Sequence, residues 1–211
     1  MRSRQTNKPD KYIVSECAKV LRDELPYNLH IFVNSVEFIA KVIDTLKLAP
    51  EAVKVVCSTS GESRQENQRK LGNAYPIGQP SDPAKKINFY TSTCFEGCDI
   101  FDPDGVTFIV SDGRKAHTLL DISTLFTQIC GRIRDSRYKA QIVHVYSTTK
   151  YSKTVTLDEF VAATQRTLAD AESYAAEINS LSEATRVKTL SKIPYINEQY
   201  VRIVDNRLVV E

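Results

Sequence analysis

Short apolar segments that alternate with helix-like segments are the feature that most constrains this chain. Buried strands are predicted over 29–33, 53–57, 87–90, 106–110 and 140–146. Helices are predicted before and between them over 10–25, 36–46, 62–72 and 118–130, and residues 73–85 are predicted to be a loop. Strands that alternate with helices in this way indicate a parallel sheet covered on both faces. The sequence therefore predicts an α/β fold with a mostly parallel sheet.

The pattern changes after residue 150. Thr156-Leu-Asp-Glu159 is a capping-box sequence, and apolar or small residues recur behind it at spacings of four and three as far as Ile178. This spacing predicts one long helix or two stacked helices, and the alternation around Asp205-Asn206 predicts a β-hairpin over 199–211. We expect three regions, which are a linker and N-terminal helix (1–28), a main domain (29–150) and a helix-and-hairpin extension (151–211).

Composition bears on whether the protein is membrane-bound, secreted or cytoplasmic. No apolar run is long enough to cross a bilayer, and the basic N-terminus lacks the apolar stretch of a secretory signal, so no membrane partner is expected. An odd number of cysteines, 5, argues against a disulfide framework and favours a cytoplasmic location. Since the net charge is only +2, a phosphate-binding surface would have to come from local placement of Lys and Arg.

Small polar residues follow the predicted strands. Ligands of an open parallel sheet bind beyond the carboxyl ends of its strands, where hydroxyl, amide and glycine residues let a phosphate approach the backbone. The candidates here are Asn34, Ser35, Ser58, Thr59, Thr91, Ser92, Thr93 and the segment 111–113. A single polar strand end fits an ordinary solvated loop equally well, but several such ends together favour a binding edge.

Gln128-Ile-Cys-Gly-Arg-Ile-Arg134 is the second candidate feature. Arg132 and Arg134 form a compact cationic fork beside Gly131. Guanidinium groups are always charged and bind phosphate bidentately, so such a fork can stabilise a transferring phosphoryl group as an arginine finger does. Taken alone, the same residues fit a solvated helix end.

In combination, these segments resemble the second RecA-like domain of superfamily-two helicases over about residues 29–147. Segments 31–35, 58–61, 91–100 and 128–134 resemble, in order, the fourth motif, the strand–loop–helix after it, the fifth motif and the sixth motif. The resemblance implies a three-layer RecA-like fold. It also implies roles for individual residues: nucleic-acid contacts from Asn34, Ser35, Ser58, Thr59, Thr91, Ser92 and Thr93, a nucleotide side with Gly97, Asp99 and Gly131, and catalytic roles for Gln128, Arg132 and Arg134.

One departure from the family pattern affects the arginine finger. Most members place the last arginine seven residues after the glutamine, and that position is Asp135 in this chain. The shorter spacing to Arg134 is similar to that of replication-origin-binding and viral-type DNA helicases. It leaves the finger open between Arg132 and Arg134.

The sequence lacks the motifs of the first RecA-like domain. No Gly-x-x-x-x-Gly-Lys-Ser/Thr and no acidic Asp-Glu box occur, although these hold the triphosphate and magnesium in such motors. We therefore expect the C-terminal half of an ATP-dependent helicase or translocase that acts on DNA (or RNA). ATP and Mg²⁺ are expected to bind only together with the first RecA-like domain of the same protein, and the chain alone is expected to lack ATPase activity.

Alternative functions remain open at this point. The chain could be a nucleic-acid-binding module without a motor role, or an interaction protein whose extension docks a partner. The cysteines at 94, 98 and 130 lack a fourth zinc ligand, so no metal site is predicted. No motif places a histidine beside a cysteine, so a cysteine nucleophile is not predicted either. The acidic residues at 99, 102, 104 and 112 could bind a cation, but Asp102-Pro-Asp-Gly is a favourable turn sequence.

Overall fold

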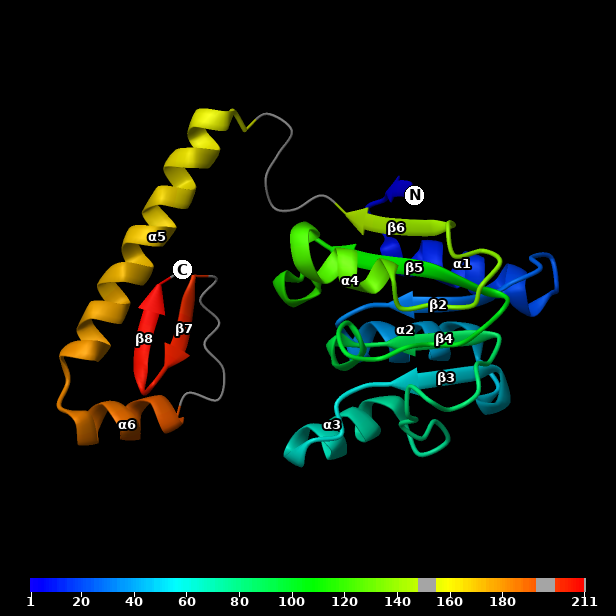
Figure 1. The fold of residues 1–211 in the computed structure, drawn as a ribbon, viewed down its shortest axis with the longest axis horizontal. Helices are drawn as coiled ribbons and strands as arrows, with labels where there is room; N and C mark the ends of the chain where they lie inside the picture. Colours follow the sequence, from blue (N-terminus) through cyan, green and yellow to red (C-terminus); the bar gives the residue numbers. More distant parts are fainter. Residues whose placement is uncertain (148–154, 193–199, 211) are drawn as a thin grey trace. The chain divides into compact units, whose positions relative to one another are not determined.

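A computed structural model describes residues 1–147, 155–192 and 200–210. The chain forms two compact units, Met1–Lys150 and Tyr151–Glu211. The first unit contains a six-stranded sheet, and the second contains a two-stranded hairpin with helices (Figure 1).

The sheet of the first unit has the strand order β1-β6-β5-β2-β4-β3, and all its neighbouring strands are parallel. The strands are β1 (Arg2–Gln5), β2 (Asn28–Phe32), β3 (Val53–Val56), β4 (Ile87–Tyr90), β5 (Gly105–Asp112) and β6 (Ile142–Ser147). The helices are α1 (Pro9–Leu21), α2 (Val36–Leu46), α3 (Gly61–Leu71) and α4 (Thr127–Cys130). The predicted α/β class is confirmed, and the architecture is consistent with a three-layer RecA-like fold.

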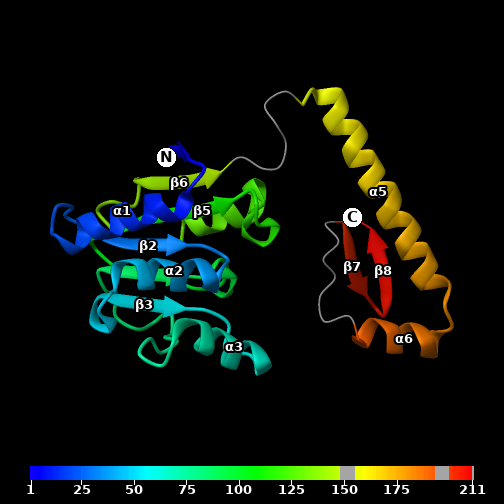
Figure 2. The ribbon, with the colours of Figure 1, turned by 180° about the vertical axis from the view of Figure 1, so that it is seen from behind.

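Helices α1 and α2 cover one face of the sheet, in front of the strands in Figure 2. The α2 helix begins at the Ser35 cap and ends where it was predicted to end. Its apolar residues at helical spacing, Phe38, Ile39, Val42 and Ile43, are buried against the sheet. Burial of each such side chain contributes roughly 1.5–3 kcal/mol, which holds the helix in place.

The segment before β6 covers the opposite face. Phe126 and Ile129 pack there against Phe32 and Tyr90. The prediction of a continuous helix over 118–130 is wrong, since the chain forms a 3-10 turn at Ala116–Thr118, a π-helical turn at Ile122–Phe126 and then α4. The cause lies at Asp121, whose carboxylate accepts a 2.9 Å hydrogen bond from Thr124 N while its carbonyl accepts one from Phe126 N.

The first 28 residues belong to the sheet unit. The β1 strand pairs in parallel with β6, and Arg2 lies opposite Val143. The α1 helix buries Ile13, Cys17 and Val20 in the main core, so this region is more than the linker and helix expected from the sequence. The helix ends at Leu21, before the expected residue 25, because Asp23 adopts a left-handed backbone conformation with φ of 56°.

The second unit confirms the predicted long helix and the hairpin, and it adds a further helix that was not predicted. The capping box at Thr156 and Glu159 starts α5 (Leu157–Ser180), and α6 (Glu183–Lys192) follows. The β7 (Val201–Val204) and β8 (Arg207–Val210) strands pair antiparallel through a turn in which Asp205 and Asn206 have φ of 48° and 59°. These angles fit the type I′ turn that matches strand twist.

Across the described ranges, no helix has the length and apolar content that a membrane span requires. All five cysteines are free thiols.

Candidate functional site

Asn34 joins the loops at the carboxyl edge of the sheet. Its side-chain amide donates a 2.8 Å hydrogen bond to the carbonyl oxygen of His117, and its oxygen accepts a 3.4 Å bond from the Ser92 backbone. The loops that follow β2, β4 and β5 are thereby held side by side. This contact brings two predicted nucleic-acid residues, Asn34 and Ser92, to one place.

The other predicted residues at this edge differ in what they can offer a ligand. Ser35 is buried as the α2 cap, since its hydroxyl accepts from Phe38 N at 3.3 Å. Thr91 is also buried, with its hydroxyl 3.3 Å from that of Thr93. Ser92, Thr93 and Thr59 are the exposed residues among the candidates with hydroxyl groups. The edge therefore presents fewer free side chains than the sequence suggested.

Ser58 lies in the loop after β3, where two contacts hold it. Its hydroxyl is 3.0 Å from the Ser60 hydroxyl, and its carbonyl accepts a 3.1 Å bond from the Asn67 side chain. Ser58 and Thr59 lie at the carboxyl end of the outermost strand, β3.

The two candidate arginines have different environments. Arg132 is buried, and its guanidinium donates to the Gln128 carbonyl at 2.9 Å, to the Gln128 side-chain oxygen at 2.7 Å and to the Cys98 carbonyl at 2.9 Å. Arg134 has a side chain that is 47% exposed, and its Nε donates to Asp99 Oδ1 at 2.7 Å. Arg132 and Gln128 thus hold the local structure, while Arg134 faces solvent.

A short parallel bridge aligns the segments that carry these residues. Ile100 N donates to the Arg132 carbonyl at 2.9 Å, and Arg134 N donates to the Ile100 carbonyl at 3.0 Å. This register places Asp99 beside Arg134. Gly97 lies two residues before Asp99 and has φ of 70°, a conformation that favours glycine. Gly131 caps the end of α4.

The end of β5 contains a charged pair that sequence reasoning missed. Asp112 accepts two hydrogen bonds from the Arg114 guanidinium, both at 2.9 Å, one from Arg114 N at 3.1 Å and one from the Ser147 hydroxyl at 2.7 Å. The Arg114 hydrogen bond is the largest cause that lowers the pKa of Asp112 to about 2. The signal in the sequence was the run Asp-Gly-Arg-Lys directly after a buried strand.

A second polar cluster lies inside the fold, below the face covered by α4. His30 is fully buried, with Nε2 2.8 Å from Asp102 Oδ2 and Nδ1 3.1 Å from the Tyr90 hydroxyl. Burial lowers the pKa of His30, so the ring is neutral at pH 7. Asp102 also accepts from Asp104 N at 2.9 Å, which confirms the predicted turn. Because the cluster has no solvent access, we interpret it as structural.

Metal-binding clusters and cavities could mark a site other than the predicted one. In the part of the chain with described side chains, no group of three His, Cys, Asp or Glu residues is arranged to hold a metal ion. A cavity of about 360 Å³ lies beside β1 and α1, where Arg4, Tyr12 and Glu16 contribute to its lining. None of the predicted site residues lines that cavity.

Comparison with known proteins adds no family assignment, since no family model and no curated protein matches this chain. The fold defines a parallel α/β domain of RecA-like layering, with a separate helix-and-hairpin unit.

Proposed function

We propose that this chain is the C-terminal half of an ATP-dependent nucleic-acid helicase or translocase, with DNA as the favoured track. Residues 1–150 would act as its second RecA-like domain. The observation that carries the proposal is the contrast between Arg132, which is fully engaged inside the fold, and Arg134, which is exposed beside Asp99. A finger must reach out of its own domain, so this contrast favours Arg134.

The chemistry would take place on a nucleotide bound by the first RecA-like domain. Charge develops on the phosphoryl oxygens during transfer, and a positioned guanidinium stabilises that charge. Asp99 engages Nε of Arg134, and no hydrogen bond from the terminal amino groups of Arg134 appears among the described residues. These groups are suited to a phosphate. ATP and Mg²⁺ would be held by the first domain, since the sequence of this chain lacks the Walker A and acidic-box motifs that bind them.

The nucleic-acid strand would run over the carboxyl edge of the sheet. Asn34 fixes the loops there, and the exposed hydroxyl groups of Ser92 and Thr93 suit contacts to a phosphodiester backbone. Such contacts carry no base specificity, as a motor that moves along a strand requires.

The test is reconstitution of the motor. The chain is joined to the Walker A-containing domain encoded in the same reading frame, and ATP hydrolysis is measured with and without single-stranded DNA. We expect DNA-stimulated hydrolysis that Arg134→Ala reduces by at least about a hundredfold, in line with the loss of an arginine finger. An upstream reading frame without a Walker A sequence, or full activity of Arg134→Ala, would overturn the proposal.

A nucleic-acid-binding module without motor activity is the second candidate. It is favoured by the observation that the Asn34 contacts assemble the carboxyl edge within this chain alone. This function predicts salt-sensitive binding of single strands by residues 1–211 and no ATP hydrolysis when an upstream domain is joined.

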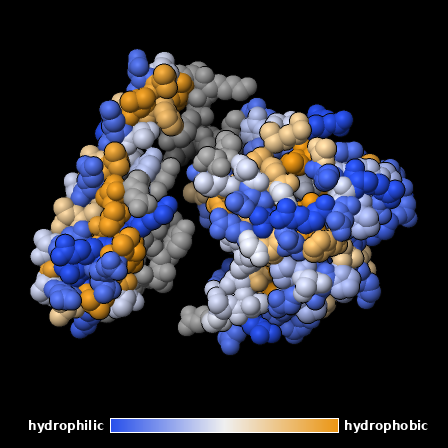
Figure 3. Space-filling view, in the orientation of Figure 1, coloured by the Kyte–Doolittle hydropathy of each residue, from blue (hydrophilic) through white to orange (hydrophobic). Residues whose placement is uncertain are grey.

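The extension supports a third possibility, partner docking, for residues 151–211 only. Apolar residues run along α5 in Figure 3, where Leu157 is 75% exposed and Val161 is 42% exposed. No contact among the described residues identifies what would cover them. The nucleic-acid functions therefore remain the proposals for the sheet unit.

A further inference from the structure

The Arg114 side chain is held in one orientation although it lies at the surface. Its side chain is 61% exposed, whereas that of Asp112 is 10% exposed. Nε and Nη2 of Arg114 donate to the two different oxygens of the Asp112 carboxylate, each at 2.9 Å. This bidentate geometry fixes the plane of the guanidinium. The carboxylate lies behind the guanidinium, and the exposed part of the arginine faces solvent.

The carboxylate itself is fixed by a set of buried contacts. Ser147 donates to Asp112 Oδ1 at 2.7 Å and accepts from Gly113 N at 2.9 Å. Thr118 accepts from Asp112 N at 2.9 Å and donates to the Asp112 carbonyl at 3.0 Å. An ordinary surface ion pair has no such support and is held weakly. A guanidinium that is already held in one orientation loses little side-chain freedom when it binds an anion.

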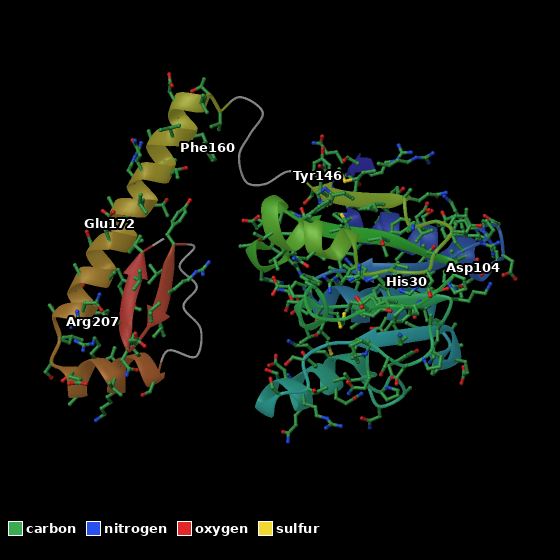
Figure 4. All side chains as sticks on the ribbon, in the orientation of Figure 1. His30, Asp104, Tyr146, Phe160, Glu172 and Arg207 are labelled. Atoms are coloured by element: carbon green, nitrogen blue, oxygen red, sulfur yellow. The ribbon has the colours of Figure 1, made fainter. Side chains whose placement is uncertain are left out.

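Arg114 belongs to the edge already described for the candidate site. Asn34 bonds to the carbonyl of His117, which lies three residues after Arg114, and also to the backbone of Ser92. Ser147 follows Tyr146, which Figure 4 labels at one end of the strands, whereas Asp104 is labelled at the other end. Arg114 thus lies at the same end of the sheet as Ser92 and Thr93.

We propose that Arg114 binds a backbone phosphate of the nucleic-acid strand that passes over Ser92 and Thr93. Asp112 and Ser147 are the positioning residues for this contact. The inference rests on the proposed nucleic-acid function and names a further residue of the same track. The ligand is the phosphodiester group, because the guanidinium offers charge and paired donors but no means to read a base edge.

Arg137 provides a matched control at the other end of the strands. Arg137 pairs with Asp104, and its side chain is 67% exposed, similar to that of Arg114. The Arg114→Ala and Arg137→Ala variants therefore remove the same charge, and each breaks one aspartate–arginine pair. Only the first change alters the edge that carries Asn34 and Ser92.

The experiment measures binding of a fluorescein-labelled thymidine oligonucleotide to residues 1–211 by fluorescence anisotropy, over a series of salt concentrations. We expect Arg114→Ala to weaken binding by roughly three- to tenfold and to reduce the slope of log K against log salt by about 0.7, as loss of one phosphate contact does. Arg137→Ala leaves both quantities unchanged. Arg114→Lys gives an intermediate affinity with the wild-type slope, since it keeps the charge and loses the fork.

The positioning role has a separate readout. Asp112→Asn keeps the arginine charge and removes the ionic clamp, so we expect weaker binding with an unchanged salt slope. Equal behaviour of Arg114→Ala and Arg137→Ala, with wild-type binding intact, overturns the inference and leaves the proposed function standing. Absence of any wild-type binding overturns the inference and the binding-module candidate, whereas the motor proposal is decided by the reconstitution. Circular dichroism of each variant verifies that its fold is retained.

Discussion

Arg132 turns back onto Gln128, one helical turn earlier, and donates to both its side-chain oxygen at 2.7 Å and its carbonyl oxygen at 2.9 Å. A third bond to the Cys98 carbonyl ties the end of α4 to the loop after β4. The arrangement divides the two arginines of one short motif between different tasks. One arginine stabilises the domain, and the other is available at its surface.

The division predicts that two alanine variants differ in how much they destabilise the protein. Arg132→Ala removes three hydrogen bonds from a buried cation and leaves their acceptors unsatisfied, so it should lower the free energy of unfolding by about 2–4 kcal/mol. Arg134→Ala removes an exposed ion pair and should change the free energy of unfolding by less than about 1 kcal/mol. Urea denaturation followed by circular dichroism measures both values. Similar losses in the two variants would contradict this assignment.

Asp112 predicts a loss of stability in acid. Its pKa is about 2 in the folded protein, below the ordinary value near 4, so the folded state favours the ionised form. The resulting stabilisation, about 2 kcal/mol, is complete above pH 4 and disappears as the pH falls toward 2. Asp112→Asn should therefore show a flatter dependence of unfolding free energy on pH in that window. A wild-type slope in the variant would rule out this origin.

His30 predicts a second pH effect at milder acidity. Burial lowers its pKa in the folded protein, so the unfolded chain binds the proton more readily. A group with a depressed folded pKa contributes stability above its ordinary value, near pH 6.5, and that stability is lost as the pH falls. His30→Gln should flatten the decline of unfolding free energy below pH 6.5, as urea denaturation at a series of pH values would show.

The main elements of the fold were predictable because their burial is periodic. The apolar residues of α2 recur every three or four positions, and β2 is buried without a break from Leu29 to Phe32. In contrast, all four residues of β1 are polar and exposed, so no hydrophobic pattern marks that strand. The strand is defined by backbone pairing with β6, which lies about 140 residues away in sequence.

The site was predictable only in part, because contacts between loops that are distant in the sequence leave no pattern in it. Strand ends locate Asn34 and Ser92, but no sequence pattern indicates that Asn34 would bond to the loop of His117. The spacing of Arg132 and Arg134 likewise leaves their roles equal. Their difference lies in contacts with residues distant in sequence, since Arg132 bonds to the Cys98 carbonyl inside the fold and Arg134 pairs with Asp99 at the surface.

The hairpin of the second unit predicts a stabilising substitution. Asn206 has φ of 59°, a conformation that glycine adopts at lower cost than asparagine. Asn206→Gly should raise hairpin stability by roughly 0.5 kcal/mol, and Asn206→Val should lower it by more than that. Amide hydrogen exchange of β7 and β8 reports the change, because their pairing spans Val201 to Val210. Faster exchange in the glycine variant would exclude the type I′ geometry.

The buried contact of His30 also limits how the central strands can align during folding. In the native alignment His30 lies opposite Asn88 on β4 and Thr107 on β5, with Asp102 within reach. A slip of β2 by one residue would turn the imidazole into the apolar layer beneath α1 and α2, away from its hydrogen-bond partners. Since an unsatisfied buried polar group costs about 1–3 kcal/mol, the misaligned pairing is disfavoured by about that amount.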